Sequence, residues 1–494
     1  MASTSKLSSL APLLFLTLAA LLVHGYHVGV EDQAIYLPAV KQDLNPALYP
    51  HDAQLFLMQT RPTLFDEAVA STVRASHLSL EAVLLLWHIA SILMVLWGCL
   101  GLARRLFPEN REAQWCSVAL VAVLLTLPVT GTSLYLVDPY LHPRSPATAA
   151  LLFMLIDLLD RKPLRAAIFF FLAASMHIQM AFYGAVLAAF IGMKPEDLRR
   201  FLPNRTAAVS MWLLPFSTLF QPGSEAWLEA ARTRRWHYLA RWEWYEWLGI
   251  VAPLAILWWF GSIGKRNGFP LLTFFSKRLV AFGAFIFISS AVLTMPAKLE
   301  RLTPYQPMRG FHLLYLMFVL LAGGLLGRFV IKREVWRWAL LFVPLCSAMF
   351  FVQRQIYPAS SHLELPGVAP KNEWLQAFAW VKQNTPQDAY FALNPQYVRL
   401  DGEDAHGFRA LAERSMMADY VKDSGVVLLF PALAEPWRRE VYARDHWMNF
   451  NQEDFERLQR EFGVTWVVLE SSHSGAATLH CPYRNEAVQV CRID

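Results

Sequence analysis

The chain has 494 residues, of which 55% are hydrophobic and 17% are charged, whereas a soluble globular chain carries about 25% charged residues. Its apolar residues come in runs of about 20, the length that crosses a bilayer as a helix, so the composition excludes a soluble globular protein. The net charge of +5 does not indicate nucleic-acid binding. The basic residues lie in short loops between apolar runs, where they set the orientation of a membrane protein.

The hydropathy pattern predicts a polytopic α-helical membrane protein with about eleven spans. The first run follows Lys6 and has no clear cleavage site after it, which favours an uncleaved helix over a signal peptide. With the N-terminus in the cytoplasm, eleven spans place the C-terminus outside, as fits a bacterial inner membrane. The expected spans cover 8–27, 80–102, 115–134, 146–160, 165–177, 180–193, 206–220, 246–263, 279–296, 309–330 and 336–353.

The segment 165–193 has two interpretations. As one helix, it would place the basic residues after it outside the cell. As two short helices that turn near His177, it keeps those residues in the cytoplasm, which satisfies the positive-inside rule.

The first outer loop, 27–79, is too long to be a simple connector. It begins with Glu31 and Asp32, and charge beside the bilayer is costly and usually functional. Two amphipathic helices are expected at 53–60 and 63–75, with apolar faces suited to the membrane surface. The loop therefore suggests a site, and the alternative is a solvated acidic pair that caps the next helix.

Asp138 in the second outer loop is a second acid on the same side of the membrane. Hard divalent cations such as Mg²⁺ or Mn²⁺ prefer carboxylate oxygens, so Asp138 and Asp32 are candidate ligands of one metal ion. The alternative is that Asp138 caps the helix that follows Pro143.

Four further residues are candidate contacts for a phosphate or a substrate hydroxyl: His177, Arg235, Arg241 and Arg309. Arg309 opens a long helix, where free N–H groups favour an anion. Arg235 and Arg241, like Arg232 and Arg234, stand among tryptophans and tyrosines in the outer loop 221–245, where arginines can bind a lipid phosphate. The alternatives are a packing histidine at 177, an aromatic belt in the loop and snorkelling of Arg309.

Residues 354–494 differ from the membrane domain, 1–353, because apolar content falls and helices alternate with strands. A helix is expected around Trp374–Val381 and another over 454–462, ended by Gly463. With strands at 390–393 and 464–469, they predict a small extracytoplasmic α/β domain. Cys481 and Cys491 predict a disulfide, which requires an oxidising compartment, and the alternative is two free thiols.

Together these features resemble the glycosyltransferase C superfamily of polytopic membrane enzymes, and more narrowly a bacterial group within it. The resemblance is carried by Glu31-Asp32-Gln33-Ala34-Ile35-Tyr36-Leu37-Pro38-Ala39, Leu48-Tyr49-Pro50-His51-Asp52, Pro307-Met308-Arg309-Gly310-Phe311 and Cys481-Pro482-Tyr483-Arg484-Asn485. It implies a polyprenyl-phosphate- or polyprenyl-diphosphate-linked sugar donor. By analogy the acidic residue Asp32 or Glu31 is the catalytic base. Asp138 would be a metal or base partner, and Arg309 a phosphate contact.

The expected function is transfer of a sugar from a polyprenyl-phosphate-linked donor to an acceptor on the extracytoplasmic side. The expected partners are that donor and membrane lipids, with no nucleic acid. Two rival classes use a similar architecture. A transporter or flippase would keep charges within its helices, and a non-catalytic assembly protein would have acids that do not converge on one cavity.

Overall fold

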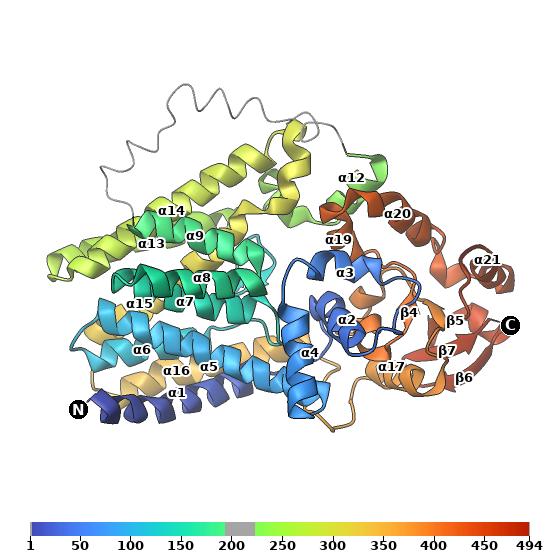
Figure 1. Ribbon diagram of the computed structural model, residues 1–494, viewed down its shortest axis with the longest axis horizontal. Coiled ribbons are helices and arrows are strands. Elements are labelled where there is room, and N and C mark those ends of the chain that lie inside the picture. Colours follow the sequence, from blue (N-terminus) through green and yellow to red (C-terminus); the bar gives the residue numbers. More distant parts are fainter. Residues whose placement is uncertain (1, 193–222, 494) are drawn as a thin grey trace.

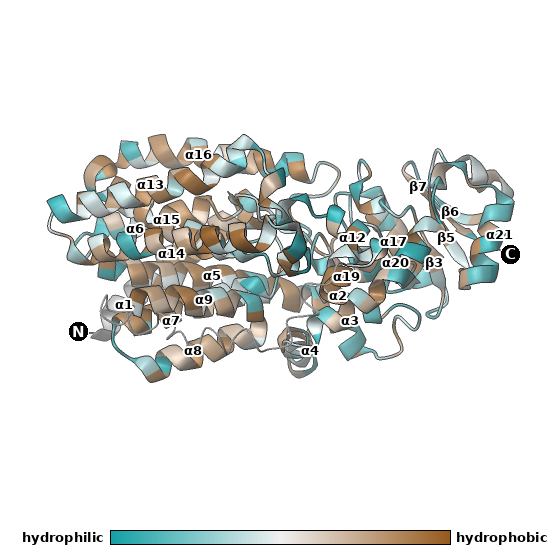
Figure 2. Cartoon of the chain, turned by 90° about the horizontal axis from the view of Figure 1, so that it is seen from above, coloured by the Kyte–Doolittle hydropathy of each residue, from teal (hydrophilic) through white to brown (hydrophobic). Residues whose placement is uncertain are grey.

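The structure, a computed structural model, describes residues 2–192 and 223–493. A bundle of helices forms one end of the elongated molecule, and a sheet with its covering helices forms the other, which carries the C-terminus (Figure 1). Figure 2 shows the bundle helices mainly in hydrophobic colours and more hydrophilic residues toward the sheet end. The chain is therefore a polytopic helical membrane protein with a C-terminal sheet domain.

Within the described part of the chain, five helical segments are long and apolar enough to cross a membrane, judged by length and composition. They are α5 (Leu80–Leu106), α13 (Trp244–Arg266), α14 (Pro270–Thr294), the stretch Lys298–Ile331 and α16 (Val335–Ile356). That stretch begins within η4 (Ala297–Tyr305) and continues through η5 (Pro307–Gly310), α15 (Phe311–Leu326) and η6 (Gly327–Ile331). The other bundle helices are α1 (Ala2–His24), α6 (Arg111–Val123), α7 (Arg144–Leu159), α8 (Pro163–Met176) and α9 (Ile178–Gly192).

Most predicted spans have a matching helix, and the interpretation of 165–193 as two helices is confirmed by α8 and α9, which meet at His177. The predicted helix at 206–220 lies outside the described residues, so the count of eleven stays a prediction.

The predicted helix 115–134 is wrong over its second half. Helix α6 ends at Val123, and β1 (Pro128–Val129) pairs with β2 (Leu134–Tyr135) in an antiparallel hairpin. Pro128 lacks the N–H that a continuing helix needs and disfavours helical backbone at Leu127. The hairpin turns at Gly131, where a Cβ atom would lie 2.1 Å from the Trp242 ring.

The first loop folds into three helices, α2 (Gln33–Leu44), α3 (Gln54–Thr60) and α4 (Phe65–Ser76). The amphipathic helices predicted at 53–60 and 63–75 are present, but their apolar faces are buried in the protein. Phe56 of α3 packs in a cluster with Trp227 and Val427, and Phe65 of α4 packs in the main bundle core. A loop that borders a second domain buries its apolar stripe there instead of in lipid.

The C-terminal domain contains a five-stranded sheet in the order β4-β3-β5-β7-β6. The pairs β3–β4 and β3–β5 are parallel, while β5–β7 and β6–β7 are antiparallel. The strands are β3 (Tyr390–Ala392), β4 (Ser415–Met416), β5 (Trp466–Glu470), β6 (His480–Arg484) and β7 (Val488–Arg492). The helices are α17 (Glu373–Asn384), α18 (Phe408–Ala412), α19 (Asp423–Leu429), α20 (Ala434–Tyr442) and α21 (Gln452–Phe462).

Both faces of this sheet are covered. Phe378 of α17 packs with Val468 on one face, and Phe455 of α21 packs with Val467 on the other. Gly463 ends α21 in the left-handed conformation, as predicted. Short helical turns complete the domain at η7 (Tyr397–Arg399), η8 (Pro431–Leu433), η9 (Trp447–Asn449) and η10 (Ser474–Thr478).

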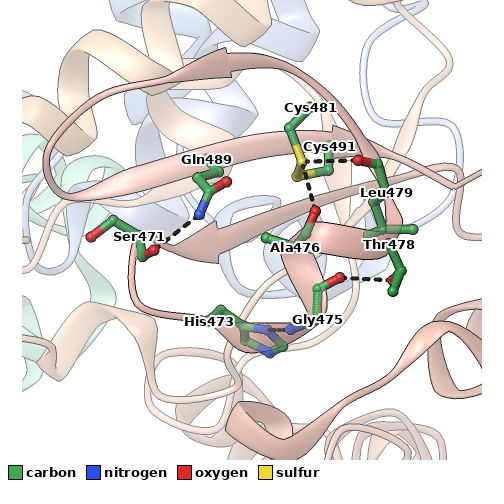
Figure 3. Close-up of a disulfide and its surroundings, with 9 residues drawn as sticks. All are labelled: Ser471, His473, Gly475, Ala476, Thr478, Leu479, Cys481, Gln489 and Cys491. Atoms are coloured by element: carbon green, nitrogen blue, oxygen red, sulfur yellow. Dashed lines mark hydrogen bonds between the residues drawn. A yellow bond between two sulfur atoms is a disulfide. The ribbon is translucent and has the colours of Figure 1, made fainter.

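Cys481 of β6 and Cys491 of β7 are joined by a disulfide (Figure 3). The bond closes the terminal hairpin beside the turn η10. The other three cysteines, Cys99, Cys116 and Cys346, are free thiols in or beside bundle helices.

Candidate active site

A cavity of about 800 Å³ lies between the helical bundle and the C-terminal domain, within the size range of ordinary ligand sites. One part of its wall is charged or polar, and the other is apolar and comes largely from α9 and α14. The charged or polar lining includes Asp32, His142, His177, Arg234, Arg309 and Lys422.

The segment before Asp32 is held by the C-terminal domain. The Glu31 N–H donates to the Ala405 carbonyl at 2.9 Å, and the Gly407 N–H donates to the Gly29 carbonyl at 2.7 Å. Glu31 has a φ of +50°, a left-handed conformation that non-glycine residues rarely adopt. This turn delivers Asp32 to the start of α2, where its side chain makes no capping hydrogen bond. Asp32 lines the cavity, and 38% of its side chain is exposed.

His142 is the nearest polar side chain to Asp32. Its Nε2 atom lies 3.3 Å from Asp32 Oδ2, and its Nδ1 atom accepts the Arg144 N–H at 3.0 Å. Because Nδ1 is an acceptor, the neutral ring carries its proton on Nε2. Burial and the Arg144 charge lower the pKa of His142, which keeps the ring neutral near pH 7.

Asp32 is ionised in this setting. Burial alone would raise its pKa, but the hydrogen bond from His142 and the positive charges of Lys422 and Arg144 hold that pKa well below its ordinary value. The cavity therefore contains a carboxylate that stays charged across the physiological pH range.

Asp138 is bound to Arg144 by two contacts, of 2.9 and 2.7 Å, and both side chains are buried. It does not cap the helix after Pro143. Among residues 2–192 and 223–493, no group of three or more His, Cys, Asp or Glu side chains is arranged to hold a metal ion. The predicted metal role of Asp138 stays a prediction.

Two arginines in the lining have no carboxylate partner within the described chain. Arg309 Nη1 donates to Gln179 Oε1 at 3.1 Å, and Arg234 Nη2 donates to the carbonyls of Val421 and Lys422. The Nε atoms of both arginines are buried without a hydrogen-bond partner among the described residues. An unpaired buried N–H donor is costly, and such donors favour an anionic ligand.

The remaining predicted residues have different surroundings. Arg235 is paired with Glu243 and Glu246 at the surface, and Arg241 lies over the Tyr238 ring. Neither lines the cavity, whereas the neighbouring Arg234, another of the arginines expected to contact a phosphate, does.

Two other predicted residues, His177 and Glu31, lie beside His142 and Asp32. His177 lines the cavity, with its ring centroid 5.9 Å from that of His142. Glu31 forms an ion pair with Lys422.

Comparison with known proteins finds no matching family model and no matching curated protein. Among solved structures, the chain is similar to archaeal oligosaccharyltransferase AglB from Archaeoglobus fulgidus, in complex with an inhibitory peptide and a dolichol-phosphate. The identity is 12%, the TM-score is 0.48, and the match covers 94% of this chain and 70% of that one.

A second similar structure is an Archaeoglobus fulgidus oligosaccharyltransferase in complex with Zn and sulfate. Here the identity is 13% and the TM-score 0.45, over 93% of this chain and 67% of that one. The resemblance of the sequence to the glycosyltransferase C superfamily stays a prediction. At these identities and TM-scores, the likeness assigns no role to any residue of the site.

Proposed function

We propose that this protein is a membrane glycosyltransferase that moves a sugar from a polyprenyl-phosphate-linked donor to an acceptor on the extracytoplasmic side. One observation carries the proposal. An ionised carboxylate, Asp32, and two arginines without carboxylate partners, Arg234 and Arg309, line a single cavity. A base and a cluster of cations are the two things that this transfer needs.

The apolar wall of the cavity suits the lipid part of such a donor. Phe182 of α9 and Phe285 of α14 belong to this wall, and their side chains are 60% and 47% exposed. Both helices belong to the apolar bundle, where exposed rings face lipid. A prenyl chain lying between α9 and α14 would bring its phosphate to the arginines.

In the proposed reaction, Asp32 takes the proton of an acceptor hydroxyl or amide as that group attacks the anomeric carbon. The bond from the anomeric carbon to the phosphate oxygen breaks, and the polyprenyl phosphate leaves with the electron pair. Arg309 and Arg234 neutralise the charge that develops on the phosphate. A single displacement inverts the configuration of the anomeric carbon.

The geometry favours Asp32 over Glu31 as the base. Asp32 lines the cavity and is oriented by His142, whereas the carboxylate of Glu31 is paired with Lys422. The order Glu-Asp in the sequence left this choice open. In this proposal Glu31 is a counter-ion that shapes the site.

The convergence of Asp32 and Arg309 on one cavity also separates the proposal from its rivals. An assembly protein has no need of such convergence. A transporter would need charges along a path through the bundle, whereas these residues lie beside the C-terminal domain.

Release of prenyl phosphate tests the proposal directly. Purified protein in nanodiscs is mixed with a panel of farnesyl-phosphate-linked sugars and an envelope extract that supplies acceptors. We expect Asp32→Asn to release farnesyl phosphate at least about 100-fold more slowly than the wild type, the loss expected for a general base. Asp43→Asn is the matched control, because Asp43 is an exposed residue of α2 paired with Arg74. Wild-type release by Asp32→Asn would exclude Asp32 as the base.

A further inference from the structure

We propose that the C-terminal domain completes the anion subsite of this cavity, with Lys422, Arg234 and Arg309 together binding the phosphoryl group of the donor. The identity of the donor rests on the proposed function. The existence of an anion subsite rests on the charges, contacts and unpaired donors of these residues.

Two of the three cations around the cavity have no direct counter-ion. Lys422 is paired with Glu31, whereas Arg234 and Arg309 form no ion pair with a carboxylate among the described residues. Asp32 and Asp419 act on Arg234 only through their charge. A monoanionic phosphodiester, such as a sugar linked through phosphate to a lipid, would supply the direct anionic partner that the two arginines lack.

The C-terminal domain contributes Lys422 and also holds Arg234 in position. Lys422 stands at the start of α19, and the carbonyls of Val421 and Lys422 accept hydrogen bonds from Arg234. Asp419 Oδ1 accepts the Val421 N–H at 2.7 Å, which fixes the turn that presents these carbonyls. The domain therefore sets the position of an arginine that belongs to the membrane part of the chain.

Gly425 in α19 allows the Arg234 guanidinium to approach the helix closely. A Cβ atom at that position would lie 2.8 Å from Arg234 Nη2 and 3.4 Å from its Cζ. The obstructed atoms are the far end of a flexible side chain, so a methyl group here would displace the guanidinium without disturbing the helix. Gly425 thus provides a way to move Arg234 without removing any charge.

Three N–H donors around the subsite have no partner among the described residues: Arg234 Nε, Arg309 Nε and Trp236 Nε1. All three belong to side chains that line the cavity. Arginine and tryptophan nitrogens only donate, so the group that satisfies them must be an acceptor. Phosphate oxygens are strong acceptors, and their negative charge would pair directly with the two arginines.

Lys422 can meet such a ligand because it lines the cavity while it is paired with Glu31. The Lys422 side chain is buried, whereas that of Glu31 is 44% exposed and can be solvated by water when a ligand takes part of the Lys422 charge. Binding of a phosphoryl group would let Lys422 share its charge between Glu31 and the ligand. Removing the charge of Glu31 should therefore strengthen phosphate binding.

The test measures binding, independently of transfer. Full-length protein in neutral detergent is titrated with farnesyl phosphate, and isothermal titration calorimetry measures the dissociation constant. Farnesol, which lacks the phosphate, is the parallel ligand, and inorganic phosphate is the competitor. We expect saturable binding of farnesyl phosphate that is at least about 10-fold tighter than that of farnesol, the gain expected from charge-assisted hydrogen bonds.

The variants should change the affinity for farnesyl phosphate in opposite directions. Lys422→Ala, Arg234→Ala and Gly425→Ala should each weaken farnesyl phosphate binding by about 10-fold or more, and Glu31→Gln should strengthen it. Two changes should leave it unchanged: Arg232→Ala, at an exposed arginine in the same loop, and Gly192→Ala, where a Cβ atom would meet no neighbour among the described residues.

The outcomes separate this subsite from the proposed function. If the first three variants weaken binding but no sugar is transferred, the anion subsite stands and the glycosyltransferase proposal falls. Competition by inorganic phosphate supports a site that recognises the phosphoryl group itself. If Lys422→Ala and Gly425→Ala keep the wild-type affinity and melting temperature, or if farnesol binds as tightly as farnesyl phosphate, the subsite is excluded.

Discussion

His142 Nε2 lies 3.3 Å from Asp32 Oδ2, and this contact joins the second outer loop to the start of α2. The opposite ring nitrogen of His142 accepts the backbone N–H of Arg144. The ring is thereby held in the tautomer that offers a proton to Asp32. Asp32 is kept ionised and oriented by a neutral group, which leaves its charge available to an acceptor's proton.

The first prediction concerns the dependence of transfer on pH. In the wild type the pKa of Asp32 is held well below its ordinary value, so the rate should not fall on the acid side until the pH is below about 4. Burial is the largest influence and raises this pKa, so His142→Gln, which removes the ring's hydrogen bond, should move the acid limb to higher pH. The rate of farnesyl phosphate release between pH 4 and 8 measures this shift.

The control for this prediction is His446→Gln, because His446 is an exposed histidine of the C-terminal domain. It should keep the wild-type profile. A purely structural role of His142 would lower the rate equally at every pH, and that result would exclude His142 as the group that sets the pKa of Asp32.

The second prediction concerns the buried pair of Arg144 and Asp138. Arg144→Met leaves the buried Asp138 carboxylate without its partner and should lower the free energy of unfolding by about 3–5 kcal/mol. The matched change Arg333→Ala breaks the pair with Glu112, in which the Arg333 side chain is 89% exposed, and should cost about 1 kcal/mol or less. Equilibrium unfolding in mixed micelles compares them. Equal losses would mean that the buried pair does not stabilise the fold.

The third prediction concerns the contact between the C-terminal domain and the segment that bears Asp32. A Cβ atom on Gly407 would lie 2.5 Å from Ala34 Cβ and 2.7 Å from Ala34 Cα. Gly407→Ala should therefore push the start of α2 away and slow transfer by about 10-fold or more, since small displacements of catalytic groups are costly. Gly192→Ala is again the control. A wild-type rate for Gly407→Ala would show that this contact does not position Asp32.

The fourth prediction concerns the compartment of the C-terminal domain. A disulfide between Cys481 and Cys491 forms stably only in an oxidising environment. Protein denatured without reductant should therefore react with PEG-maleimide at the three free cysteines alone, and at all five after reduction. Five reactive thiols before reduction would place the domain in a reducing compartment and contradict the proposed topology.

Much of the fold could be predicted because its signals are local. Apolar runs marked the bundle helices, the basic residues after 193 favoured the division of 165–193 into α8 and α9, and Gly463 marked the end of α21. The error at 115–134 arose where an apolar run continued past Pro128, whose backbone restriction outweighs hydropathy. Helix α2 was missed because its buried face contacts other segments on several sides and therefore leaves no clear amphipathic period.

The site was predicted only in part, because sequence patterns show local signals and not contacts between distant segments. Asp32, His177 and Arg309 line the cavity, but the partners that define their chemistry come from distant segments. No local pattern connects His142 with Asp32 or Lys422 with Glu31. The choice between Arg234 and its neighbour Arg235 depends on the short turn η2 (Arg235–His237). Arg234, just before this turn, lines the cavity, whereas Arg235 is paired with Glu243 at the surface.

The central claim is that Asp32 catalyses removal of a sugar from a polyprenyl phosphate carrier. Mass spectrometry of lipids extracted from cells that carry only wild-type or only Asp32→Asn protein tests it most directly. The account predicts that Asp32→Asn cells accumulate one polyprenyl-phosphate-linked sugar and lose the matching envelope glycan, with the protein present at the wild-type level. An unchanged lipid profile and an intact glycan in those cells would contradict it.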